Sequence, residues 1–201
     1  MKVKDIIITA LRFIGREDVS EKLKAGAVMG GGSADGDNGE TEVFTAEESE
    51  VIDTLLYCFN SVEDELARCY LPLETEEKMT SQSGVYPFGI FQKRPVKIIS
   101  VKSGKKNVKY SLSQKSLNCD SGEITVRYGF APVKKDLNGE SEFSTLLSNE
   151  RLVAAGTASE YCLIDGEAKL SAVWESVYRG EIEHVQRTRL SGLRLPPRRW
   201  V

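Results

Sequence analysis

A capped amphipathic helix is the feature that most constrains the fold of this chain. Thr45 and Glu48 form a T-x-x-E pattern, in which a hydroxyl and a carboxylate each bond a backbone amide at the start of a helix. One apolar stripe then recurs at helical spacing, formed by Val51, Leu55, Phe59, Val62 and Leu66. Pro72 ends the pattern because proline cannot continue a helix. The sequence therefore predicts a helix over about 45–69 as the spine of the fold.

Shorter helical patterns lie on both sides of this helix. Apolar residues repeat at helical spacing over 3–14, and Gly15 stands where a C-terminal cap is expected. Helices are predicted over about 149–164 and 167–189, and the short turn Asp165–Gly166 between them favours antiparallel packing. The glycine-rich segment 26–40 lacks the lysine of a phosphate loop and the acids of a calcium loop. We interpret it as a flexible loop.

The pattern changes after Gly84, where three short runs rich in β-branched and aromatic residues cover 96–101, 107–112 and 123–128. They predict a small antiparallel sheet between the helices. The expected fold class is α+β, mainly a helical bundle of about four helices with an inserted small antiparallel β-subdomain and an extended C-terminal tail. The expected parts are 1–82 (helical), 83–135 (inserted β-subdomain), 136–190 (closing helices) and 191–201 (arginine-rich docking tail).

Charge is spread unevenly along the chain. Residues 1–82 carry eight basic and eighteen acidic side chains, although the whole chain has a net charge of −3. Lysines cluster on the edges and turns of the predicted sheet, where they commonly block edge-to-edge aggregation. The alternative is a contact surface for an acidic partner.

Residues that carry catalytic chemistry are scarce. His184 is the one histidine, and the four cysteines lie far apart with no C-x-x-C pair. No nucleophile, metal-protease or nucleotide-binding motif occurs, and no apolar run approaches the ~18 residues of a membrane span. We expect a protein that is not an enzyme, with reduced thiols, no cofactor, no metal and no membrane span.

The C-terminal segment stands out by composition. From Arg179 onward there are six arginines, no lysine and two acids. Arginine and tryptophan are enriched at interface hot spots, and a proline pair rules out further helix. The residues expected to bind a partner are Arg187, Arg189, Arg194, Leu195, Pro196, Pro197, Arg198, Arg199 and Trp200.

The order of these elements, together with Ala10–Gly15 (ALRFIG), Thr125–Pro132 (TVRYGFAP) and Leu195–Trp200, resembles the head–tail connector (adaptor) proteins of tailed bacteriophages. The tail-tubular-A-like adaptors are similar in size. The resemblance implies a virion protein made in the host cytoplasm that forms a ring, commonly of twelve copies, beneath the portal. It also implies that the C-terminal tail binds the portal, that a tail protein follows below, and that DNA passes through the channel.

Two other functions stay open. A nucleic-acid-binding module would use the basic strand residues and the tail arginines, but the chain is acidic overall and Tyr110 and Tyr128 make a thin stacking platform. An enzyme of unrecognised type would have no constellation of residues that could be named as its site.

Deletion of residues 194–201 is expected to leave the chain folded, because these residues follow the last predicted helix, and to abolish co-assembly with the portal. Thermal unfolding and co-purification with the portal measure the two effects. Unfolding of the shortened chain would instead make Trp200 a core anchor of its own subunit.

Overall fold

The computed structural model describes residues 1–26, 43–120, 122–143 and 149–191. The chain divides into two compact units. A helical unit contains residues 1–63 and 134–201, and a β unit contains residues 64–133. The β unit begins earlier than residue 83, where the inserted subdomain was expected, because the end of the long helix and a strand over residues 73–81 belong to this unit.

The described residues form five helices and two antiparallel sheets, so the expectation of mainly a four-helix bundle was wrong, although the α+β class holds. The helices are α1 (Val3–Phe13), α2 (Glu17–Ala25), α3 (Ala46–Glu65), α4 (Glu150–Ile164) and α5 (Ala168–Ser191). Helix α2 is the helix that the sequence did not predict. It is short and highly charged and buries only Val19, Ser20 and Leu23, which is too weak an apolar stripe to mark a helix by periodicity.

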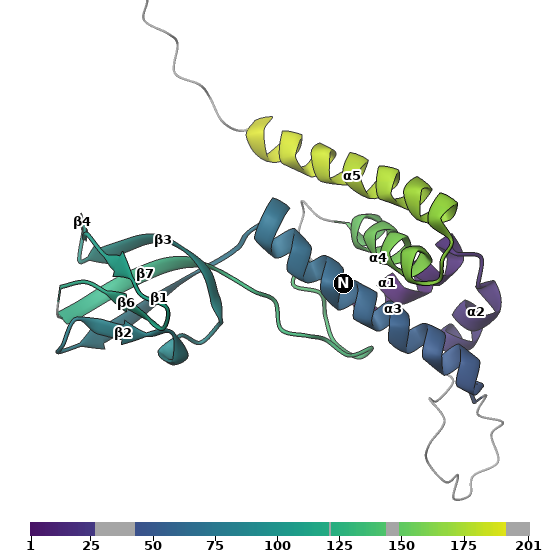
Figure 1. Cartoon of the computed structure of the whole chain (residues 1–201), viewed down its shortest axis with the longest axis horizontal. Coiled ribbons are helices and arrows are strands. Elements are labelled where there is room, and N and C mark those ends of the chain that lie inside the picture. The colour runs from purple at the N-terminus through teal and green to yellow at the C-terminus, as the bar shows by residue number, and fades with distance from the viewer. Residues whose placement is uncertain (27–42, 121, 144–148, 192–201) are drawn as a thin grey trace, which may run out of the picture. The chain divides into compact units, whose positions relative to one another are not determined.

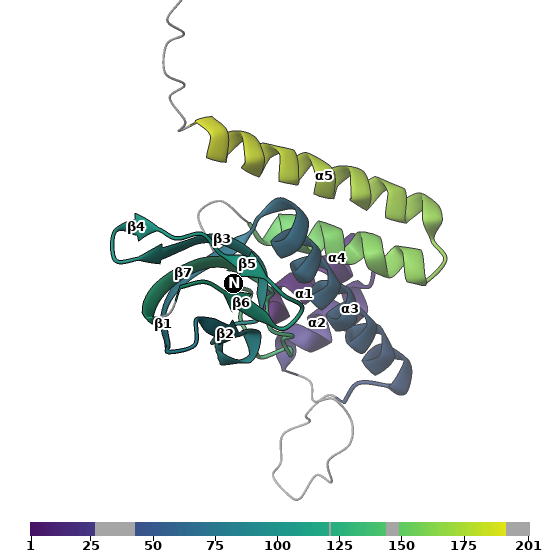
Figure 2. The ribbon, with the colours of Figure 1, turned by 60° about the vertical axis from the view of Figure 1, so that its left-hand side comes forward.

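Helix α4 forms the centre of the helical unit, between α5 and α1 (Figure 2). Its residues from Leu152 to Ser159 are all buried, as expected of a helix that is covered on every side. Gly156 permits the closest approach, because a Cβ atom there would lie 2.9 Å from both Tyr178 of α5 and Val62 of α3. Across the same core, Trp174 stacks on Phe13 with ring centroids 4.2 Å apart.

The start of α3 is the predicted capping box. The Thr45 amide donates to Glu48 Oε2 at 2.9 Å, and the Glu48 amide donates to Thr45 Oγ1 at 3.2 Å. Lys22 of α2 also donates to Glu48 Oε1 at 2.8 Å. The hydrogen bond from Lys22, followed by that from Thr45, holds the pKa of Glu48 below its usual value. One carboxylate thus caps α3 and ties α2 to it.

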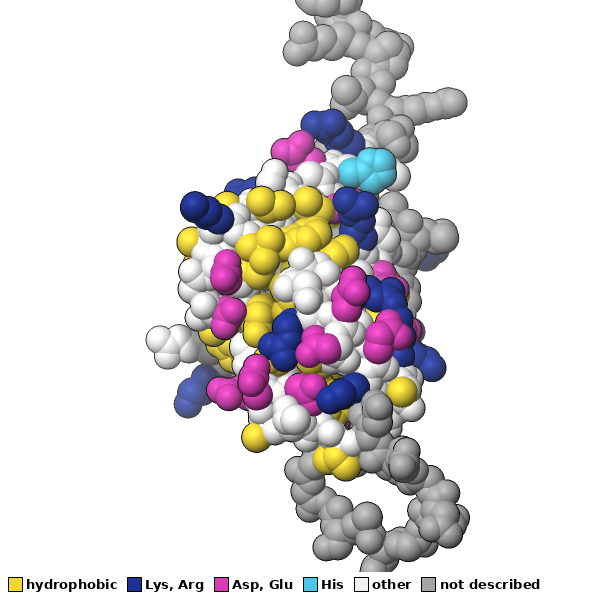
Figure 3. All heavy atoms as spheres, turned by 90° about the vertical axis from the view of Figure 1, so that its right-hand side faces the viewer, with side chains coloured by type: hydrophobic (Ala, Val, Ile, Leu, Met, Phe, Trp, Pro, Cys, Tyr) yellow, Lys and Arg dark blue, Asp and Glu magenta, His cyan; other side chains and the backbone are white. Residues whose placement is uncertain are grey.

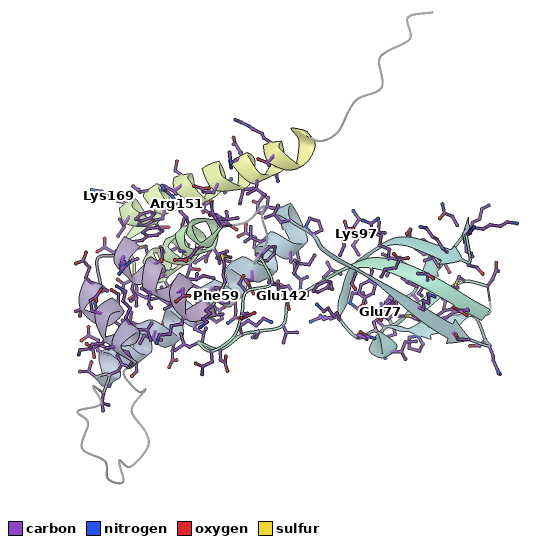
Figure 4. The ribbon with its side chains drawn as sticks, turned by 180° about the vertical axis from the view of Figure 1, so that it is seen from behind. Phe59, Glu77, Lys97, Glu142, Arg151 and Lys169 are labelled. Carbon is purple, nitrogen blue, oxygen red and sulfur yellow. The ribbon has the colours of Figure 1, made fainter. Side chains whose placement is uncertain are left out.

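The end of α3 holds the segment by which the chain returns from the β unit. Asn60 accepts from the backbone amide of Lys135 at 2.7 Å and donates to its carbonyl at 3.0 Å. Glu63 Oε1 accepts from the Ser141 hydroxyl and, at 3.2 Å, from the amide of Glu142, which Figure 4 labels. After Glu65 the chain passes into a π-helical turn, Leu66–Tyr70.

The N-terminus closes over the same return segment. The Val3 amide donates to the Gly139 carbonyl at 3.0 Å, and the Ser141 amide donates to the Met1 carbonyl at 2.9 Å. Residues 134–143 are therefore held from two directions, by α3 and by Met1 and the first residue of α1.

The β unit packs two sheets around one core. The first has the order β1–β7–β3–β4, from β1 (Leu73–Ser81), β7 (Gly122–Phe130), β3 (Pro95–Ser103) and β4 (Lys106–Asn107). The second has the order β2–β6–β5, from β2 (Val85–Pro87), β6 (Ser116–Asn118) and β5 (Ser111–Leu112). The core is Met79, Tyr86, Phe91, Val101, Leu117, Ile124, Val126, Tyr128 and Phe130.

Two details of this unit differ from the sequence-based expectation. The run 107–112, expected as one strand, contributes to two short strands in different sheets. Strand β1 was not predicted, because most of its residues are polar and Met79 is its one buried side chain. Its inward Glu77 is nevertheless satisfied by the hydroxyl of Tyr128 on β7.

The apolar stripe expected on α5 is covered over only part of its length. Tyr178, Ile182 and Val185 are buried, whereas Val173 is 56% exposed. Periodicity identified the helix but not the extent of the surface that packs on it.

We expect the free energy of unfolding of the Glu63→Gln variant, relative to the wild type, to rise with pH. Glu63 is 1% exposed and its Oε2 has no hydrogen-bond partner in the described part of the chain. Burial raises the pKa of this carboxyl above 4.5, despite the hydrogen bonds from Ser141 and Glu142. A raised folded-state pKa destabilises the fold only where the carboxyl would be ionised, by about 1.4 kcal/mol for each pH unit between its unfolded and folded pKa values.

Urea unfolding at pH 4 and pH 7.5 measures the difference in free energy of unfolding between the variant and the wild type. These two pH values lie on either side of the pKa of a glutamate in an unfolded chain, which is about 4.3. Glu50→Gln, at an exposed position of the same helix, is the matched control. A difference between the Glu63→Gln variant and the wild type that does not change with pH would show that Glu63 is readily ionised in the fold.

Candidate interaction surfaces

The arginine-rich segment is described only at its beginning. Arg187 lies on α5 with 79% of its side chain exposed, and it pairs with Glu183 at 3.0 Å. Such i,i+4 pairs stabilise a helix surface, so Arg187 also has a role within its own helix, which its composition-based assignment to partner binding did not indicate. Arg189 belongs to α5, but its side chain is outside the described part. Arg194, Leu195, Pro196, Pro197, Arg198, Arg199 and Trp200 lie outside the described residues.

A hollow of about 800 Å³ opens on the helical unit, along the first half of α3 and beside the end of α4. Its lining residues are Phe44, Ala46, Ser49, Glu50, Asp53, Thr54, Tyr57 and Ile164. A second hollow of about 470 Å³ shares Glu50, Thr54 and Ile164 with it and continues to Asp165. We call the two together the α3–α4 groove.

Two large apolar side chains in this groove are exposed to solvent. Tyr57 is 67% exposed and Ile164 is 57% exposed. Figure 3 shows hydrophobic side chains gathered on one face of the molecule, with both acidic and basic side chains around them. Exposed apolar patches with a polar rim are typical of interaction sites.

The rim of the groove is acidic. Glu47, Glu50, Asp53 and Asp165 line it and are all exposed. The one basic residue in the lining, Arg16, is paired with Asp18 at 3.5 Å and with Glu47 at 3.6 Å. The groove therefore favours a ligand that carries both positive charge and apolar side chains.

A basic surface lies on the β unit, and we call it the lysine hairpin. Strands β3 and β4 are joined by a turn at Gly104, whose φ of +59° suits glycine. Five exposed lysines belong to this region and form no ion pair within the described residues. They are Lys97, Lys102, Lys105, Lys106 and Lys109. Strand β4 lies at the edge of its sheet. Lysines at a sheet edge hinder pairing with the strands of other molecules, and they also provide a surface that can bind an anion.

Catalytic groups do not converge in the described part of the chain. His184 is exposed on α5, beside Arg151 and Glu181. The residues with described positions contain no group of three or more histidine, cysteine or acidic side chains that could hold a metal ion. All four cysteines are free thiols, and burial raises the pKa of Cys58 to about 12. A thiol with such a pKa is a poor nucleophile at neutral pH.

Sequence patterns carried a partial signal for the groove. Tyr57 lies off the core stripe of α3, and its i−4 and i−7 neighbours are Asp53 and Glu50, which places all three on one face. An aromatic residue on an otherwise polar helix face marks a candidate contact. Ile164 gave no such signal, because its exposure depends on how α4 ends against α3.

No protein-family model matches the chain, and no curated protein matches it. A separate observation concerns membranes: among the helices that the structure describes, none is both long and apolar enough to span one.

Proposed function

We propose that this chain is a structural virion protein, a head–tail adaptor of a tailed bacteriophage without catalytic activity. Copies would form a ring beneath the portal, with a tail protein below and DNA passing through the channel. The observation that best supports this proposal is the presence of complementary interaction surfaces on one chain. The α3–α4 groove combines the exposed apolar side chains of Tyr57 and Ile164 with four exposed acids, while residues 192–201 carry three arginines and no acid. Heterologous contacts of this kind close into rings when the rotation between copies permits it.

Layout gives further support to the adaptor proposal. A β unit is inserted between α3 and the α4–α5 hairpin, and a basic segment follows α5. This order of elements resembles that of phage adaptors.

Co-expression with the portal protein of the same phage is expected to yield a ring that co-purifies with the portal. Native mass spectrometry would give the number of copies, and negative-stain images would show their arrangement. A chain that remains monomeric beside the portal and does not bind it would refute the adaptor proposal. A monomer in the absence of the portal would not, because assembly can require the portal as a template.

Nucleic-acid binding is the second candidate function, and the lysine hairpin is the observation that favours it. Its five lysines have no ion pairs within the described residues and are free to contact phosphates. Stacking support is weaker than the sequence suggested. Tyr128 is fully buried and hydrogen-bonded to Glu77, which leaves Tyr110 at 38% exposure.

Filter binding of double-stranded DNA at low salt separates the two candidates. Under the adaptor proposal, the wild type binds weakly, and a Lys105→Gln, Lys106→Gln variant differs little from a control variant. The control is Lys134→Gln, Lys169→Gln, which removes two exposed lysines of the helical unit. Micromolar binding with a steep salt dependence, lost only in the hairpin variant, would favour the nucleic-acid-binding module.

A further inference from the structure

We infer that the α3–α4 groove binds the C-terminal segment, residues 192–201, of a second copy of this chain. The inference deepens the proposed ring and rests on that proposal for its biological setting. It assigns to the segment a neighbouring subunit as its partner, where the family resemblance suggested the portal.

Charge and apolar content select this occupant. Residues 192–201 contain Arg194, Arg198 and Arg199 together with leucines, prolines and Trp200, and they contain no acid. The groove offers four exposed acids around Tyr57 and Ile164. Arginine forms bidentate hydrogen bonds with carboxylates, and tryptophan contributes a large apolar contact area. Each property of the segment has a counterpart in the groove.

The glycine-rich segment fits the groove poorly, although it joins the chain close to it at Phe44. Residues 27–42 contain Asp35, Asp37, Glu40 and Glu42 and no basic residue. Placing them against the acidic rim would bring like charges together, which is unfavourable. Electrostatics therefore favour the C-terminal segment over this one.

The length of the C-terminal segment favours binding to the groove of a second copy over binding to the groove of its own chain. Helix α5 starts three residues after Asp165, at one end of the groove, and its 24 residues extend away for about 36 Å (Figure 1). Trp200 follows the last residue of α5 by nine positions, which span about 30 Å when fully extended. A segment that folded back would be stretched along α5 with no slack to enter the groove near Ile164. A neighbour's segment has no such constraint.

Trp200 can report the contact directly in the full chain. The chain has two tryptophans, and a Trp174→Phe variant leaves Trp200 as the only one. This substitution keeps an aromatic ring against Phe13. It removes no hydrogen bond, because the Trp174 indole nitrogen has no partner within the described residues. Circular dichroism and thermal unfolding would verify that the variant folds.

We expect the fluorescence of Trp200 to shift to shorter wavelength as protein concentration rises, in parallel with the mass measured by sedimentation velocity. Added salt should reverse both changes, because screening weakens contacts between exposed charges. A blue-shifted emission that does not depend on concentration would show docking on the same chain. An emission typical of exposed tryptophan at every concentration would show no docking in the groove. Either result would overturn the inference.

Charge reversal tests the identity of the groove. In the Trp174→Phe background, Glu50→Lys with Asp53→Lys should abolish the shift, and so should Arg198→Glu with Arg199→Glu. An equimolar mixture of these two variants should recover it, because the unaltered arginines of the first would meet the unaltered acids of the second, and the lysines of the first would meet the glutamates of the second. Glu123→Lys with Glu140→Lys, two exposed acids outside the groove, should leave the shift unchanged. A mixture that fails to recover the shift would also overturn the inference.

These measurements use the chain alone, so they are independent of the portal experiment. Loss of the contact between groove and segment, with portal co-assembly intact, would leave the adaptor function standing and remove only this contact. Self-association through the groove without binding to the portal would support the contact between groove and segment and refute the adaptor proposal.

Discussion

The attachment of residues 134–143 to the end of α3 is the constraint on which the helical unit depends. The chain leaves this unit at α3, builds the β unit, and must return in a position that delivers α4 to the core. Asn60 bonds both backbone groups of Lys135, and Glu63 accepts from Ser141 and Glu142. Because the entropy of closing a loop grows slowly with its length, a few well-placed hydrogen bonds can hold this return whatever the size of the insertion.

Helix α3 serves both the stability of the fold and its candidate function, on two different faces. One face carries the buried stripe from Val51 to Val62 and packs in the core. The other presents Glu50, Asp53 and Tyr57 to the groove. The same rigid element therefore fixes the positions of the acids and of the apolar residues between them. A docking surface built on a helix that the core already orders needs little further ordering when a partner binds.

Elements defined by local chemistry were predicted correctly, and those defined by distant neighbours were not. The capping box at Thr45, the helix end at Gly15 and the start of α4 at Asn149 each depend on residues within one turn. Helix α2 and strand β1 have too few buried side chains to produce a clear period. The groove was missed for a related reason, because Tyr57 and Ile164 come from helices far apart in the sequence. The sequence did indicate that binding would involve the C-terminal arginines, and this stays a prediction.

The sequence by itself determined where most helices begin and end, the presence of a small sheet between the long helix and the closing helices, and the separation of acidic from basic segments. Those properties follow from backbone capping, side-chain periodicity and composition, which act over a few residues. Only the tertiary structure decided that Glu63 is buried, that Val173 is exposed, and that an acidic rim surrounds apolar side chains on α3 and α4. Burial and exposure depend on which surfaces meet, and that is set by packing between segments that the sequence keeps far apart.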